Sequence, residues 1–252
     1  MTVQTVFEFL NKIAPFETQM GFDNAGVLIG SKTKEIKKIG VVLDVTPQAV
    51  EYAAAHGIDL IVSHHPVIFS GLKSIDANSV VYRLIREDIA VISAHTNLDA
   101  AENGVNQVLA QTLGLTNIKP LGLPGEPTPP MGRIGTLPRE LTCYELATLV
   151  NKTLHTRVKM VNTQKGVKTV AVCGGAGEDF ILPAVAAGAD VLVTADVKHH
   201  NFLLANSLGL CLMDAGHFET EQGIVPSLCK ELEQLEDVAI EVIPQSSPVE
   251  YV

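Results

Sequence analysis

The chain has 252 residues, more than a typical domain of about 150 residues, which points to one large α/β unit or two modest lobes. Its 18 basic and 28 acidic residues give a formal charge of −10. This charge disfavours a protein that mainly grips phosphate backbones, because such binding depends on Lys and Arg. A hydrophobic content of 46% with 18% charged residues excludes a disordered chain and allows a sizeable aliphatic core.

The sequence gives no indication of a signal peptide, a membrane span or a cysteine-based metal site. The first residues carry acidic and amide side chains within their apolar pattern, which a signal peptide would not tolerate, and no run of about 18 apolar residues predicts a membrane span. We expect a cytoplasmic protein. No C-x-x-C pair is present, so we interpret the four cysteines as buried thiols rather than zinc ligands: Cys143, Cys173, Cys211 and Cys229.

In the first half of the chain, helical patterns alternate with short β-branched runs. A helix over 3–13, capped by Thr2, opens the chain. Strands are predicted near 37–45, 58–63 and 89–95, and helices over 46–57, 79–88 and 103–115. This alternation predicts right-handed βαβ units.

The composition changes at 121–132, where prolines alternate with glycines. We interpret about 120–132 as a linker between an N-terminal α/β lobe (1–122) and a C-terminal α/β lobe (123–252). A helix over 139–154 and an extended stretch at 156–161 follow.

The second half repeats the layout of the first. Gly57–Ser63 and Gly188–Thr194 align residue for residue, and the segments ending at Gly104 and Gly223 correspond in the same order. We therefore predict an α/β fold of two structurally similar lobes, with mixed, mostly parallel sheets, arising from an internal duplication.

Potential metal ligands follow the carboxyl ends of predicted strands. Five such side chains come from three strand ends: His64, His65, Asp99, His217 and Glu221. In open parallel sheets, ligands bind outside the carboxyl ends of the strands. We therefore expect these side chains to converge on a metal cleft between the lobes.

Each of these residues also has a simpler interpretation. A lone His-His pair is most often a surface feature, but His64 and His65 end a buried strand, where imidazoles without partners would be costly. Acids in a first helical turn fit the helix dipole, and this explains Glu219 but not His217. Because His217 and Glu221 lie four residues apart, they would share one helix face. Asp99 alone fits a helix cap. Taken together, the three loops favour metal binding.

Histidine nitrogens and carboxylate oxygens without sulfur suit Zn, Fe, Mn or Co. Five side chains exceed the needs of an open mononuclear site, so we expect two divalent cations per subunit, with one carboxylate bridging them. Two ions about 3.5–4 Å apart can activate a water molecule, which is the arrangement of a dinuclear hydrolase.

Other polar motifs receive secondary roles. His95, four residues before Asp99, and the pair His199-His200 are candidates for lining the cavity as proton carriers, although Asp196 could instead cap a helix carrying the pair. The glycine-rich run 174–177 lacks the Lys-Ser/Thr of a phosphate-binding P-loop, so we interpret it as a tight turn.

The motifs around His64-His65, His95–Asp99 and His217–Glu221, together with those at 22–30 and 173–180, resemble the NIF-three-like family over essentially the whole chain. Bacterial members are described as dinuclear metal-centre hexameric proteins or GTP cyclohydrolase I type 2 homologues. The resemblance implies two divalent cations held by the five residues above, with Glu221 bridging, and a toroidal homohexamer. Three positions depart from the family pattern: Phe22, where Trp is frequent, Ala195 and Phe218.

The resemblance implies the site more firmly than the reaction. Our leading hypothesis is a metal-dependent hydrolase acting on a small heterocyclic or nucleotide-like molecule. The alternative is a non-catalytic metal-handling protein or metallochaperone. A ring that encloses single-stranded nucleic acid is disfavoured by the charge of −10.

Overall fold

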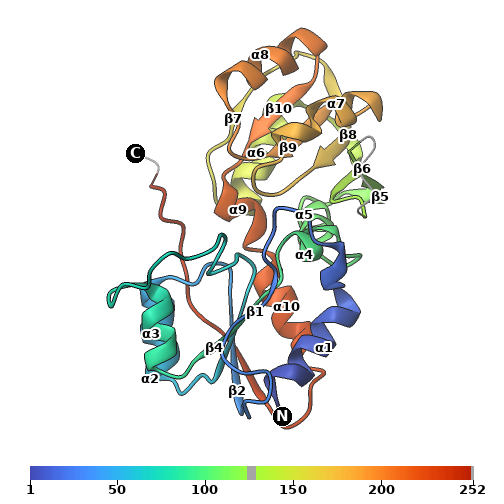
Figure 1. The fold of residues 1–252 in the computed structure, drawn as a ribbon. Helices are drawn as coiled ribbons and strands as arrows, with labels where there is room; N and C mark the ends of the chain where they lie inside the picture. Colours follow the sequence, from blue (N-terminus) through green and yellow to red (C-terminus); the bar gives the residue numbers. More distant parts are fainter. Residues whose placement is uncertain (124–128, 251–252) are drawn as a thin grey trace. The chain divides into compact units, whose positions relative to one another are not determined.

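A computed structural model describes residues 1–123 and 129–250 of the chain. The chain forms two compact units, each built on a mixed β-sheet with flanking helices (Figure 1). Unit 1 comprises Met1–Leu98 and Ile224–Ser246, and unit 2 comprises Asp99–Gly223 with the residues from Ser247 onward. None of the described helices has the length and apolar character needed to traverse a lipid bilayer.

The sheet of unit 1 has the strand order β1-β4-β3-β2-β11. Its strands are β1 (Gly26–Ile29), β2 (Lys38–Val42), β3 (Leu60–Ser63), β4 (Ala90–Ser93) and β11 (Ala239–Val242). All neighbouring pairs are parallel except β1 with β4. Every residue of β3 and β4 is buried, as expected for central strands covered on both faces.

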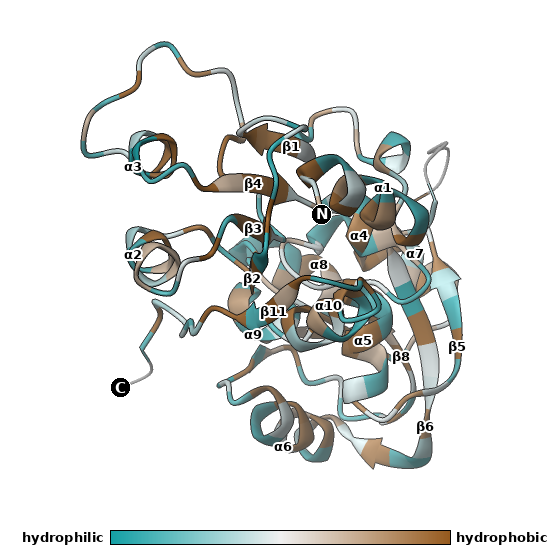
Figure 2. Cartoon of the chain, turned by 90° about the horizontal axis from the view of Figure 1, so that it is seen from below, coloured by the Kyte–Doolittle hydropathy of each residue, from teal (hydrophilic) through white to brown (hydrophobic). Residues whose placement is uncertain are grey.

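Helices cover both faces of this sheet. They are α1 (Val3–Ile13), α2 (Pro47–Ala55), α3 (Val80–Arg86) and α10 (Ile224–Leu232), with a 3₁₀ turn at Phe16–Thr18. Helices α2 and α3 lie on one face and α1 and α10 on the other (Figures 1 and 2). Thr2 accepts a backbone N–H bond at the start of α1, so the predicted cap is present, and Thr46 caps α2 in the same way. The short helix α4 (Thr96–Ala100) crosses the boundary between the units.

The sheet of unit 2 has the order β5-β6-β8-β9-β10-β7. Its strands are β5 (Thr116–Leu121), β6 (Gly132–Thr142), β7 (Lys159–Met160), β8 (Gly166–Val172), β9 (Val191–Thr194) and β10 (Cys211–Asp214). Its helices are α5 (Val105–Thr112), α6 (Cys143–Leu154), α7 (Ile181–Ala186), α8 (His199–Leu208) and α9 (His217–Glu221), with a 3₁₀ turn at Glu178–Phe180. Helices α5 and α6 pack into one apolar core, and α7 and α8 into another.

The two units share a topology. Each contains three parallel strands joined by two helices, β2-α2-β3-α3-β4 in unit 1 and β8-α7-β9-α8-β10 in unit 2. An antiparallel strand, β1 or β7, pairs with the third parallel strand in each. The predicted α/β fold of two similar lobes is therefore present. Parallel pairs predominate only in unit 1, because the hairpin β5-β6 adds antiparallel pairs to the sheet of unit 2.

The division of the chain differs from the predicted lobes 1–122 and 123–252. Helix α5 follows β4 in sequence but packs within unit 2, and α10 and β11 return to unit 1, where β11 pairs with β2. Unit 1 is thus completed by α10 and β11 from the second half of the chain, and unit 2 by α5 and β5 from the first half. A single linker between two continuous lobes does not describe this arrangement.

The predicted linker 120–132 and the helix over 139–154 also need correction. Pro120 and Leu121 pair with Arg133 and Gly132, so both ends of the proline-rich segment belong to the β5-β6 hairpin of unit 2. Residues 124–128 lie outside the described part of the chain. Strand β6 runs to Thr142, which caps α6 through a reciprocal hydrogen-bond pair with Glu145, so the helix begins at Cys143.

Candidate metal centre

The carboxyl ends of the parallel strands of unit 1 carry the first group of candidate ligands. Asp44 follows β2, His64 and His65 follow β3, and His95 follows β4. Since these three strands are adjacent and parallel, their carboxyl ends meet at one edge of the sheet.

At that edge the three histidines form a compact cluster, which we call the first donor set: His64, His65 and His95. Their ring centroids are 4.8 to 5.5 Å apart, and each ring can offer a nitrogen within 4.8 Å of the others. His64 is buried, while His65 and His95 are half-buried. The structure therefore adds His95 to the two histidines predicted as ligands from this unit.

Every ring in the first donor set is held through Nδ1. His65 Nδ1 lies 2.7 Å from Asp44 Oδ1, and His64 Nδ1 lies 3.0 Å from the carbonyl oxygen of Ala94. Each Nδ1–H donates to its oxygen, which fixes the tautomer and leaves the lone pair on Nε2. Metal-binding histidines are oriented in this way.

His95 is held by the best-buried carboxylate of the group. Its Nδ1 lies 2.8 Å from Asp23 Oδ1, and the other oxygen of Asp23 accepts bonds from the backbone N–H and hydroxyl of Thr96. Burial opposes ionisation of this enclosed carboxyl group, but the hydrogen bonds from His95 and Thr96 prevail and lower the pKa of Asp23 to about 2. Asp23 is therefore ionised at neutral pH and holds the ring of His95 in place.

Unit 2 carries the second group, which we call the second donor set: Asp99, His217 and Glu221. The predicted helix at 217–221 is present as α9, and His217 Nε2 lies 3.2 Å from Glu221 Oε2 across one turn. On its other side, His217 Nδ1 lies 2.7 Å from Asp196 Oδ2. Asp196 therefore orients His217 instead of capping α8, whose N-cap is Lys198.

Asp99 and Glu221 approach the same thiol. Burial raises the pKa of Cys173 well above its usual range, and the charges of Asp99 and Glu221 raise it further. Asn106 helps to hold this region, because its amide donates to the Asp99 carbonyl at 3.4 Å and accepts from Gly174 N–H at 2.7 Å. Both carboxylates of the second donor set thus lie around the end of β8.

The glycine-rich run 174–177 makes room for the second donor set. A Cβ atom on Gly175 would collide with the Glu221 carboxylate and would lie 3.0 Å from His217 Nε2, and the residue has a φ of +61°. Gly175 N–H donates to Thr220 Oγ1 at 3.0 Å. The run is a tight turn, as predicted, and the reason for its glycines is the close approach of α9.

The other candidate histidines differ from these. His199 and His200 begin α8 with exposed side chains, and neither belongs to a group of potential ligands among the described residues. Asp23, Asp44 and Asp196 are functional candidates that the sequence analysis missed or interpreted otherwise. Asp44 and Asp196 could have been found by the signal that revealed His64, since each lies two residues beyond the end of a parallel strand.

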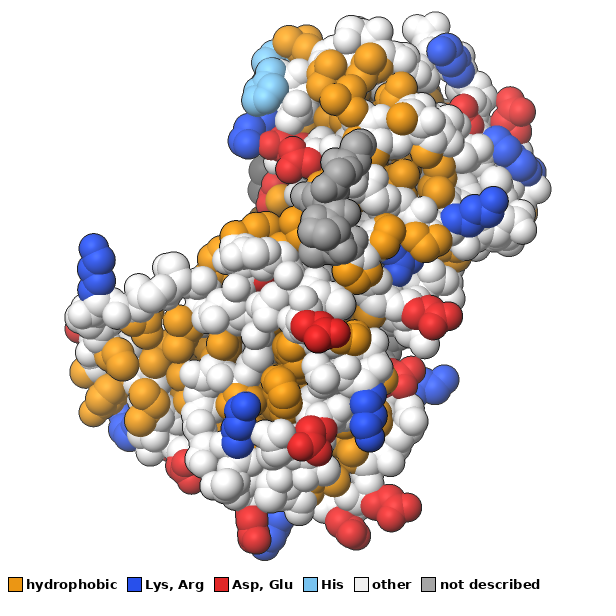
Figure 3. All heavy atoms as spheres, turned by 45° about the vertical axis from the view of Figure 1, so that its right-hand side comes forward, with side chains coloured by type: hydrophobic (Ala, Val, Ile, Leu, Met, Phe, Trp, Pro, Cys, Tyr) orange, Lys and Arg blue, Asp and Glu red, His pale blue; other side chains and the backbone are white. Residues whose placement is uncertain are grey.

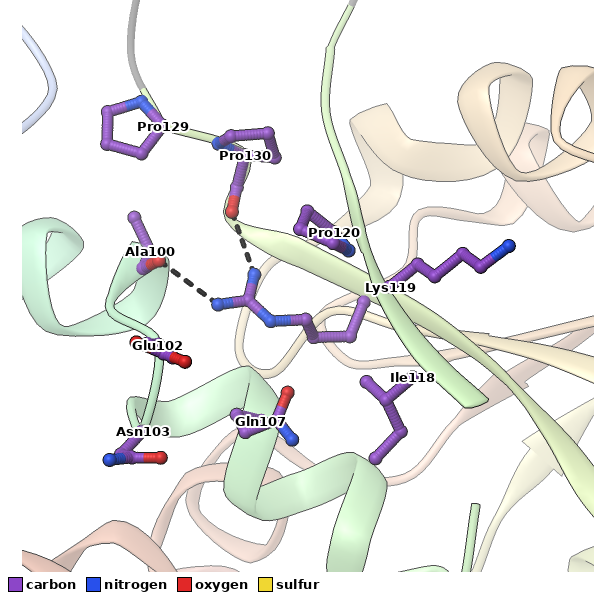
Figure 4. A pocket seen from close by; sticks show the side chains of 10 residues that line it. Ala100, Glu102, Asn103, Gln107, Ile118, Lys119, Pro120, Pro129 and Pro130 are labelled. Carbon is purple, nitrogen blue, oxygen red and sulfur yellow. Dashed lines mark hydrogen bonds between the residues drawn. The ribbon is translucent and has the colours of Figure 1, made fainter. Parts of the chain in front are cut away.

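A pocket of about 490 Å³ lies elsewhere in unit 2, lined by residues of 100–107, 118–120 and 129–133 (Figure 4). Arg133 is buried there, and its guanidinium donates to the carbonyl oxygens of Ala100, Ala101 and Pro130. Burial lowers the pKa of Arg133. None of the lining residues is a candidate metal ligand, so we interpret Arg133 as a clamp on the backbone that follows Asp99.

Comparison with known proteins gives consistent matches over the whole chain. Residues 1–248 match the sequence profile of the Duf34/NIF3 (NGG1p interacting factor 3) family. The chain is 30% identical over 250 residues to a GTP cyclohydrolase 1 type 2 homolog of Clostridium perfringens, covering 96% of this chain and 95% of that protein. It is 36% identical over 228 residues to the protein of the same name from Streptococcus pneumoniae, covering 86% and 85%. The crystal structure of Staphylococcus aureus protein SA1388 is similar with a TM-score of 0.91 and 28% identity, covering 100% and 99%.

Proposed function

This chain belongs to the Duf34/NIF3 family, and from that premise we propose that it is a metal-dependent hydrolase holding two divalent cations. The ligands that we assign are His64, His65, Asp99, His217 and Glu221, with Glu221 as the bridge, and His95 is a sixth candidate ligand. The substrate that we propose is a small heterocyclic or nucleotide-like molecule.

One observation carries this proposal: the histidines of both donor sets are held through Nδ1 by an oxygen. Carboxylates hold His65, His95 and His217 at 2.7 to 2.8 Å, and a backbone carbonyl holds His64. A histidine that only packs in a core or lies on a surface does not require a carboxylate hydrogen-bonded to its Nδ1. A carboxylate–histidine arrangement, repeated in each unit, supports metal binding by Nε2.

The donor chemistry fits divalent cations. Imidazole nitrogens and carboxylate oxygens suit Zn, Fe, Mn or Co, and the carboxylates of Asp99 and Glu221 would balance part of the charge of two dications. When bound, such ions supply Lewis acidity and activate water for hydrolysis. Asp23, Asp44 and Asp196 would keep the imidazoles in the orientation and tautomer that binding requires, and His95 would be a sixth ligand rather than a proton carrier.

The names of the relatives direct the choice of substrates. Both sequence relatives are called GTP cyclohydrolase 1 type 2 homolog, so guanine nucleotides and pterin precursors are the first compounds to test. The test is a hydrolysis screen on metal-free protein reconstituted in turn with Zn²⁺, Mn²⁺, Fe²⁺ and Co²⁺. We expect product formation that requires the metal and is lost in His217→Ala. Tight metal binding without turnover on any substrate would favour the metal-handling alternative.

We further propose that the protein assembles as a toroidal homohexamer, as its resemblance to the family implies. Sedimentation velocity tests this proposal by measuring the mass of the assembly in solution. The surface charge visible in Figure 3 gives no support to a role in enclosing nucleic acid. On the face shown in Figure 3, Lys and Arg side chains are interspersed with Asp and Glu, and no continuous basic surface is visible among the described residues.

A further inference from the structure

Two exposed phenylalanines lie beside the first donor set. Phe22 is 61% exposed and Phe69 is 52% exposed, and their ring centroids are 6.3 Å apart. The ring of Phe69 also lies 6.0 Å from that of His95, at an interplanar angle of 72°. Folding normally removes such large apolar rings from water, so two of them next to a histidine cluster call for a functional explanation.

Hydrogen bonds hold both phenylalanines in place. Asp23, which follows Phe22, accepts bonds from His95 and Thr96. Asn24 Nδ2 donates to the carbonyl oxygen of Ile68, the residue before Phe69, at 2.6 Å. The segment carrying Phe22 and the loop carrying Phe69 are thus tied to each other and to His95, entirely within unit 1. The rings are therefore presented in the same place as the candidate ligands.

We propose that Phe22 and Phe69 form a stacking platform for the planar ring of the substrate. This inference rests on the proposed function and narrows its substrate class to compounds with a flat, unsaturated heterocycle. The rings lie within the range of aromatic contact with each other, so they present one continuous apolar surface. Such a surface recognises the π face of a ring without regard to charge, and nucleobases bind to aromatic side chains in this manner.

A protein partner is the competing occupant, because Leu72 and Ile75 of the same loop are also about half exposed, at 51% and 50%. The ring contact between Phe69 and His95 favours the small heterocycle, since it places the platform beside the ligand cluster. Leu72 and Ile75 are not aromatic and therefore provide matched controls on one loop.

The absence of Trp from the chain gives a direct test. Phe22→Trp introduces a single indole fluorophore at the platform, and the variant is titrated with guanosine, adenosine, uridine and, as the probe without a base, ribose. We expect saturable quenching by at least one nucleoside and none by ribose. Adding Phe69→Ala should weaken that binding by roughly tenfold or more. Tyr144→Trp, at an exposed position of unit 2, should show no saturable quenching.

Metal content separates this inference from the proposed function. Phe22→Ala/Phe69→Ala should retain the metal content of the parent protein and lose nucleoside binding, whereas Leu72→Ala/Ile75→Ala should retain both. Retained metal without quenching by any nucleoside would overturn the platform alone. Quenching in a protein that binds no metal would overturn the hydrolase proposal alone. Loss of self-association or of metal in the double phenylalanine variant, with nucleoside binding unchanged, would also overturn the platform.

Discussion

Four histidines, from two strand-end loops and one helix, share one feature: the Nδ1 of each is hydrogen-bonded to an oxygen, although the residues lie far apart in the chain. The partner is a side-chain carboxylate for three of them and a carbonyl for His64. The sequence singled out the histidines but not these partners. Asp44 and Asp196 follow strands without any motif of their own, and the bond from His95 to Asp23 joins residues 72 positions apart.

Asp196 provides the clearest test of orientation by a partner. Its side chain is 55% exposed, so Asp196→Ala should leave the fold intact while His217 loses its Nδ1 acceptor. We expect metal affinity to fall by about 10–100-fold, as measured by competition with a chelator. Asp179→Ala, which removes another exposed acid of unit 2, should bind metal like the parent protein. Equal affinity of the two variants would contradict the orienting role.

The four cysteine thiols should not react with thiol reagents in the native protein. All four are free and buried, and burial raises the pKa of Cys173, Cys211 and Cys229, the last to about 11. At pH 8 these three thiols therefore remain protonated, and burial keeps all four inaccessible. We expect dithionitrobenzoate to label none of them in buffer and four in urea. Rapid labelling of any cysteine in the folded protein would contradict this, because it would show that the thiol is accessible to the reagent.

At the level of single elements, the turn at 174–177 links β8 to the second donor set. Gly175→Ala should displace the carboxylate of Glu221 and sharply reduce metal binding. Gly188→Ala is a matched control, since Gly188 also has a positive φ, +76°, but a Cβ there meets nothing within 4 Å. Each variant bears a backbone strain of about 1–2 kcal/mol. A similar metal affinity in the two variants would show that the position of the Glu221 carboxylate does not depend on the missing side chain at Gly175.

Elements were predictable where the pattern is local. The segments that form β3 and β4 are apolar on both faces and lie between helical patterns. Their positions and their parallel pairing therefore follow from the sequence. The start of α6 was not predictable, because Arg139–Thr142 read as helix until their pairing partner in β8 is known. The i, i+4 contact of His217 with Glu221 followed from spacing alone, whereas the roles of Gly175 and Asp196 depend on tertiary contacts.

At the scale of the whole molecule, the two halves of the chain exchange their final elements. Unit 1 depends on α10 and β11, which come after unit 2 in the sequence, and β11 pairs with β2 over Ala239–Val242. Sequence periodicity predicted the repeated α/β layout. It did not predict the exchange, since α5 and α10 have similar amphipathic patterns and either could cover either sheet.

The exchange predicts different behaviour for two fragments. Residues 99–223 contain their complete sheet and helices and should fold alone, with a native-like circular dichroism spectrum and dispersed amide resonances. Residues 1–98 alone lack the helix that covers one sheet face and the strand that pairs with β2, so they should remain unfolded. Joining 224–246 to them through a flexible linker should restore folding. Cooperative unfolding of 1–98 by itself would contradict this division.

The most direct test of the account is the number of divalent cations that each chain retains. Protein prepared without added metal, dialysed against Zn²⁺ or Mn²⁺ and freed of excess, is assayed by elemental analysis together with Glu221→Ala and His64→Ala. We predict two ions per chain in the parent protein, at most one in Glu221→Ala, and loss of one ion in preference to the other in His64→Ala. A parent protein that retains none, or a Glu221→Ala variant that still holds two, would contradict a cation pair bridged by Glu221.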